Sequence, residues 1–150
     1  MRSSNVARLS WFLWIVCAFH VLVGLSLNVD LGLREWVGGT LYSAQVDWSD
    51  GQFAYILKPL GAFMIALGVM AAMAARDPLG HRSIIIGFAV LFTMRGLQRL
   101  LFLGEIERVF AIPSSRSLVQ MVVMLSLALA LVLLLRAASA GEGRQALNAA

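Results

Sequence analysis

Two arginines stand four residues apart inside a long apolar run of the sequence. The segment FTMRGLQRLLFLGEIERVF, residues 92–110, sets Arg95 and Arg99 among leucine, phenylalanine and methionine. Residues at positions i and i+4 of a helix share one face, so both guanidinium groups point to the same side. Such a pair of cations requires negative charge nearby. The spacing indicates either a salt-bridge network within the protein or a site for an anionic group.

The depth of Arg95 makes this requirement strict. At about 1.5 Å per helical residue, Arg95 lies about 16 Å into the apolar run, near the middle of a membrane. An arginine that faces lipid at this depth costs at least ~3 kcal/mol. We therefore expect Arg95 to face a bundle interior, a wet cavity or a partner subunit.

Other apolar runs carry polar groups at similar depth. His20 is level with Arg95, and Lys58 and Gln120 are level with Gln98 and Arg99. The predicted ligand-binding residues are Arg95, Arg99, Lys58, His20, Gln98 and Gln120. The apolar runs contain no aspartate or glutamate. Three sources of negative charge stay open: an anionic ligand such as a lipid headgroup, an acid of a partner protein, or the outer-loop carboxylates Asp30, Asp47, Asp50, Glu105 and Glu107.

His20 has two interpretations, a hydrogen-bond partner for a ligand or a satisfied residue of the bundle. The second histidine, His81, belongs to the opposite side of the membrane, which excludes a haem held by two histidines of one chain. The single cysteine, Cys17, excludes an internal disulfide and a CxxC metal motif. The sequence has no HExxH, P-loop or Ser-His-Asp set, so we expect no metal and a non-catalytic protein.

The composition is that of an integral membrane protein. Apolar residues make up 60% of the 150 residues and charged residues 13%, whereas a soluble domain carries about 25% charged residues. The net charge of +4 comes from scattered residues rather than a basic patch, which excludes a nucleic-acid partner.

Four apolar runs predict an all-α, integral membrane four-helix bundle over residues 1–136. The expected helices are about 9–29, 54–75, 84–104 and 117–135, each about 20 residues and long enough to cross a membrane. The first run is expected to be retained rather than cleaved as a signal peptide. Residues 137–150 are expected to form a mobile cytoplasmic tail.

The positions of the arginines orient these helices. Six lie on the side of the termini and the 76–83 turn, and three lie on the opposite side. Because basic residues collect in the cytoplasm, both termini are expected there, in a bacterial inner membrane. The outer segment 30–53 is rich in Trp and Tyr, which predicts a short interfacial helix in LGLREWV. Gly61 and Gly68 predict close helix packing.

The segments YILKPLGAFMIALGVMAAMAARDP and GFAVLFTMRGLQRLL resemble small bacterial inner-membrane proteins of the DoxX-like group. The resemblance covers roughly residues 55–103 and implies a four-helix bundle. Some relatives are quinone-linked redox subunits, and many have no assigned activity. This chain lacks redox cysteines, so the resemblance does not imply an independent redox role. The matching positions are Lys58, Gly61, Ala66, Leu67, Gly68, Pro78, Gly96 and Arg99.

Three functions follow as expectations. The first is a non-catalytic accessory or binding protein whose outward-facing cationic pocket holds a lipid headgroup, a quinone or another amphiphile, or which docks to a larger membrane complex. The second is a quinone-linked subunit of a membrane oxidoreductase. The third is a small transporter, which would have to be oligomeric. Membrane lipids, together with a membrane-protein partner or further copies of the chain, are the expected partners.

Overall fold

The chain is entirely helical over the residues that the structure describes. This computed structural model describes residues 4–29, 32–48 and 50–149, with backbone alone at 41–42 and 142–149. The six helices are α1 (Ser4–Asn28), α2 (Leu33–Tyr42), α3 (Gly51–Arg76), α4 (Arg82–Leu101), α5 (Leu103–Phe110) and α6 (Ser114–Ala149). Four of them, α1, α3, α4 and residues Ser114–Gly141 of α6, are long and apolar enough to cross a membrane.

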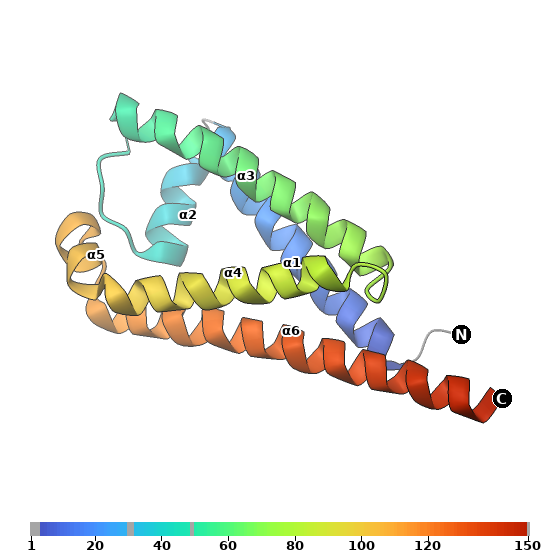
Figure 1. The fold of residues 1–150 in the computed structure, drawn as a ribbon. Coiled ribbons are helices and arrows are strands. Elements are labelled where there is room, and N and C mark those ends of the chain that lie inside the picture. Colours follow the sequence, from blue (N-terminus) through green and yellow to red (C-terminus); the bar gives the residue numbers. More distant parts are fainter. Residues whose placement is uncertain (1–3, 30–31, 49, 150) are drawn as a thin grey trace.

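The predicted helix bounds lie within five residues of the observed ones, except at the end of the fourth helix. The third apolar helix was expected to reach residue 104, but the backbone leaves the helical conformation at Phe102 (φ −109°, ψ 24°) and α5 starts at Leu103. The fourth was expected to end near residue 135, but α6 continues through Ala149 and is 36 residues long. It therefore extends past the other helices near the C-terminus (Figure 1). The mobility expected of residues 137–150 stays a prediction.

The long helices form two antiparallel pairs. α3 packs along α1, and α6 packs along α4, while α1 also contacts α6. The chain termini and the turn at residues 77–81 lie together at one end of the molecule, which we name the turn end (Figure 1). From there α3 and α4 diverge, and α2 and α5 lie at the opposite, far end. The four predicted helices thus converge at the turn end, while the two pairs separate toward the far end.

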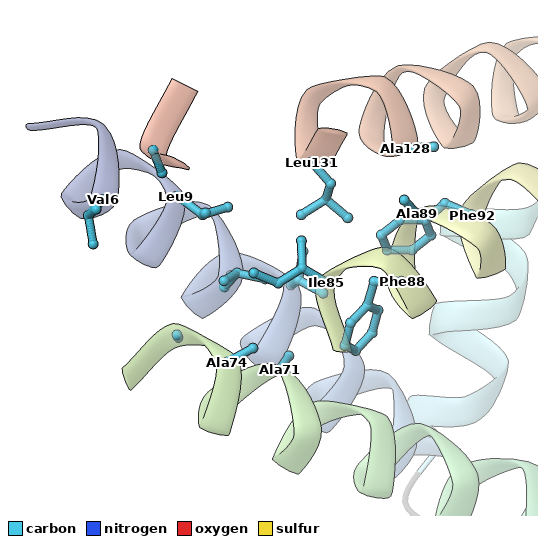
Figure 2. Close-up of a cluster of buried hydrophobic side chains, with 14 residues drawn as sticks. Val6, Leu9, Ala71, Ala74, Ile85, Phe88, Ala89, Phe92, Ala128 and Leu131 are labelled. Carbon is cyan, nitrogen blue, oxygen red and sulfur yellow. The ribbon is translucent and has the colours of Figure 1, made fainter. Parts of the chain in front are cut away.

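The shared core lies in the half of the molecule near the turn end. Ile85 and Phe88 of α4 extend between Leu131 of α6 and the alanines of α3, Ala71 and Ala74 (Figure 2). All of these side chains are buried. Because alanine is small, α3 approaches the other helices closely here, while the larger side chains of α4 fill the space.

Glycine brings α1 and α3 together along the rest of their length. A Cβ atom on Gly61 would stand 2.7 Å from the Gly24 carbonyl oxygen, and one on Gly68 would stand 3.3 Å from the Cys17 carbonyl oxygen. Backbone contact this close is open only to residues without a side chain. The Ser10 hydroxyl also donates a 2.6 Å hydrogen bond to the Ala75 carbonyl. The prediction that Gly61 and Gly68 mediate close packing is confirmed.

Helix α2 and the loop after it join the two pairs at the far end. Val37 of α2 packs in a second apolar cluster with Val23 of α1 and Met64 of α3. Beyond α2, the Gln45 N–H donates a 3.0 Å hydrogen bond to the Phe110 carbonyl oxygen at the end of α5. This bond ties the α1–α3 side to the α4–α6 side. A helix is present in LGLREWV as α2 from Leu33 onward, and Leu31 lies outside the described residues. The interfacial position of this helix stays a prediction.

Candidate functional site

The candidate site lies where α1 meets α4, one helical turn beyond the shared core. His20 on α1 is 0% exposed. Its ring packs edge-on against Phe19 and Phe88, with centroids 5.6 Å away in both cases, and lies tilted to Phe92 at 6.0 Å. The aromatic rings of two helices therefore enclose the imidazole and hold it out of the lipid.

One ring nitrogen of His20 has a partner and the other does not. Nδ1 lies 2.8 Å from the Val16 carbonyl oxygen, one turn back on the same helix. Nε2 is buried, and within the described part of the chain no donor or acceptor reaches it. A buried polar atom left without a hydrogen bond costs about 1–3 kcal/mol. Such an atom in a native protein calls for an explanation, and a ligand is one.

Arg95 is the nearest cation to this histidine along α4. It follows Phe88 and Phe92 on one stripe of the helix and is half-buried. Its charge acts electrostatically on His20. Among residues 4–29, 32–48 and 50–149, Arg95 forms no hydrogen bond and no ion pair in this structure. Arg95 thus lies three residues beyond Phe92, whose ring packs against His20, and it has no carboxylate partner among the described residues.

The other predicted site residues divide into two groups. Arg99 lies one turn beyond Arg95, is half-buried and has an interaction partner. Gln120 on α6 is also half-buried. Gln98 is exposed on the same face of α4 as Met94 and Leu101, away from the arginine stripe. The structure therefore keeps Arg99 beside Arg95 but turns Gln98 outward.

Lys58 lies apart from the arginines. It is exposed near the start of α3, far from the 77–81 turn at which α3 and α4 approach each other. Because the two helices diverge from that turn, Lys58 and Arg99 lie at their separated ends (Figure 1). Equal depth in the membrane does not bring these two cations together.

Two of the outer carboxylates have local structural roles. Asp50 caps α3 by accepting hydrogen bonds from the Gln52 N–H at 2.8 Å and the Phe53 N–H at 2.9 Å. Glu107 accepts a hydrogen bond from the Ser114 hydroxyl and so joins α5 to the start of α6. Both lie in exposed segments, and neither reaches Arg95. Asp30, a further predicted source of charge, is outside the described residues.

Sequence reasoning missed two features near the site. Ser117, in the first turn of α6, is 0% exposed, and its hydroxyl has no partner among the described residues. Phe19 completes the aromatic enclosure of His20. A serine at the start of a helix is common, so neither the residue type nor its position marks Ser117. Phe19 lies within an apolar run in which its orientation cannot be read.

The described residues contain no group of three histidine, cysteine, aspartate or glutamate side chains able to hold a metal ion. No family model, curated protein or solved structure matches this chain. The functional argument therefore depends on the fold and on the geometry of His20 and Arg95.

Proposed function

We propose that the chain is a non-catalytic, multi-pass protein of a bacterial inner membrane that binds an amphiphile through its polar headgroup. Both termini would lie in the cytoplasm, so the far end with α2 and α5 would face outward. Arg95 and Arg99 would supply positive charge, and His20 a hydrogen-bonding nitrogen. The alkyl part of the ligand would remain among the apolar faces of the helices.

The observation that carries this proposal is the pairing of two unsatisfied groups at one depth. His20 Nε2 is buried without a hydrogen bond, and Arg95 lacks an ion pair within the described residues. Replacing either polar group with an apolar one of similar size should increase the stability of the folded protein. Both groups are explained if a headgroup completes them. The resemblance of residues 55–103 to DoxX-like membrane proteins adds only the expectation of a four-helix bundle.

The test is to find what the protein carries from its membrane. The full chain would be purified in a mild detergent, and native mass spectrometry would compare the wild type with Arg95→Met and Arg82→Met. Arg82 begins α4, is exposed and lies far from His20 along the same helix. We expect a bound amphiphile in the wild type and Arg82→Met, and its loss in Arg95→Met. A wild-type protein that carries no ligand and takes up none from added lipid would refute the proposal.

A quinone is the second candidate ligand, and one observation favours it. Three phenylalanine rings pack around His20, so the site is lined by aromatic side chains. Aromatic rings pack well against other rings in offset or edge-on arrangements. A quinone-linked subunit of an oxidoreductase would carry quinone in the same mass spectra. It would also co-purify with a partner that holds a redox cofactor.

A further inference from the structure

The hydrogen bond at Nδ1 fixes what His20 can offer to a ligand. A carbonyl oxygen only accepts hydrogen bonds, so at 2.8 Å from Val16 O the Nδ1 atom must carry the hydrogen. In a neutral imidazole with a protonated Nδ1, Nε2 holds a lone pair and acts as an acceptor. The unpartnered atom of His20 therefore requires a donor.

The surroundings of His20 do not supply that donor. Phe19, Phe88 and Phe92 carry no N–H or O–H group on their side chains. The Thr93 hydroxyl, next to Phe92 on α4, donates its hydrogen to the Ala89 carbonyl oxygen at 2.8 Å. Nothing in the described chain donates to Nε2. Among the described residues no group supplies the missing hydrogen, so a donor from outside them, a water or a ligand, would have to do so.

Arg95 sets the second requirement. A guanidinium only donates, so its partner on the ligand must be an acceptor oxygen, with or without negative charge. Arg95 is half-exposed, and no described hydrogen bond anchors it. Because His20 is fully covered and its ring packs against Phe19, Phe88 and Phe92, a ligand reaches Nε2 only when a neighbouring side chain moves. A ligand that met both requirements would present an O–H and an acceptor oxygen.

We propose that the bound amphiphile is a long-chain carboxylic acid, whose O–H lies against His20 Nε2 while its other oxygen accepts from Arg95. This inference rests on the proposed function, because it names the ligand class of the same site. The shared proton lies between the carboxyl oxygen and Nε2, whichever atom holds it. A phosphodiester lipid or a carboxylic ester has no such proton. Either one would leave Nε2 as it is in the free protein.

The experiment compares an acid with its own methyl ester. The delipidated full chain in mild detergent would be labelled with a diazirine-bearing long-chain carboxylic acid, and cross-links would be mapped by peptide mass spectrometry. Unlabelled acid, its methyl ester and a phosphatidylcholine, a phosphodiester whose headgroup has no O–H, would then compete with the probe. We expect cross-links in the peptides around His20 and Arg95. Competition by the acid should be about tenfold stronger than by the other two, the factor that one buried hydrogen bond contributes.

Two variants separate the possible results. In His20→Phe the ring is kept but the acceptor is lost, so the preference for the acid over the ester should fall, and what remains is the attraction of Arg95 for the carboxylate. In Arg82→Met the preference should match that of the wild type. Equal competition by acid and ester in the wild type, or stronger competition by the phosphodiester, would overturn the carboxylic acid while leaving the proposed function standing. Failure of every amphiphile to protect the site would overturn both.

Discussion

Replacing Arg95 with methionine should stabilise the folded protein. Methionine is unbranched and apolar, so it keeps much of the side-chain length without the charge. An arginine at the centre of a membrane helix costs about 2.5–3.5 kcal/mol on insertion scales. Because Arg95 is only half-buried, we assign it roughly half of this cost. Arg95→Met removes that share, so we expect the free energy of unfolding to rise by about 1.5 kcal/mol.

The sign of this change distinguishes the two interpretations of the arginine. If Arg95 belonged to a buried salt-bridge network, its removal would leave an uncompensated charge and cost about 3–5 kcal/mol. Equilibrium unfolding in mixed micelles of mild and denaturing detergent, followed by tryptophan fluorescence, would measure the difference. Arg82→Met is the matched control, since its exposed arginine at the start of α4 should change stability by less than about 0.5 kcal/mol.

The measurement must be made on delipidated protein. A ligand present at a hundred times its dissociation constant adds about 2.7 kcal/mol to the stability of the state that binds it. Added long-chain acid should therefore stabilise the wild type and leave Arg95→Met unchanged. A loss of more than about 2 kcal/mol in delipidated Arg95→Met, with Arg82→Met unaffected, would refute the reasoning about this site.

Three further substitutions test the fold around the site. Gly61→Ala should cost about 1–3 kcal/mol, because the new Cβ would press on the Gly24 carbonyl oxygen. Gly87→Ala, where nothing lies within 4 Å, should instead gain up to about 1 kcal/mol from helix propensity; equal effects at the two glycines would contradict the close packing. Asp50→Ala removes the cap of α3 and should cost about 0.5–2 kcal/mol by the same unfolding assay. His20→Phe removes the unpartnered nitrogen and should be at least as stable as the wild type, and a cost above about 1 kcal/mol would show that Nε2 is satisfied.

The parts of the fold that could be predicted from the sequence came from its hydropathy and its small residues. Each spanning helix was evident because a run of about 20 apolar residues has few other uses. Gly61 and Gly68 revealed a close helix contact but not its partner, because the facing residue, Gly24, is 37 residues away in sequence (61 − 24 = 37). The convergence of the helices at one end was not predictable, since the apolar faces that meet and those that face lipid have the same composition.

The sequence of α5 has an amphipathic pattern, but a search for long apolar runs does not detect it. The structure half-buries Leu103, Ile106 and Phe110, spaced as on one face of a helix, and exposes Glu105 and Glu107. This pattern is typical of a short amphipathic helix at an interface. A window suited to membrane spans is too long to detect eight residues, so the segment was expected to be a loop.

For the candidate site, the sequence predicted the depth of each side chain along its helix but not its orientation around the helix axis. The rise per residue gave depth, and depth set His20 level with Arg95, but it grouped Lys58 and Gln98 with them as well, and the structure exposes both of these. Orientation around the helix axis decides which side chains meet. Gln98 differs from Arg99 by one position, or about 100° of rotation, and this is enough to turn it outward.

The location of the two unsatisfied groups is itself informative. Near the turn end, four helices share one apolar core, and at the far end α2 and the Gln45–Phe110 hydrogen bond join the two pairs. His20 and Arg95 lie between these regions, where the described contacts between α1 and α4 are mainly those of aromatic rings. Aromatic side chains can shift without breaking hydrogen bonds, so this is the part of the fold that can admit a headgroup at least cost. Local rules of packing and polar satisfaction are most often broken at functional sites. The chain keeps these rules at Ser10 and at Asp50 but leaves His20 Nε2 without a partner among the described residues, and this contrast is what supports the proposal of a ligand there.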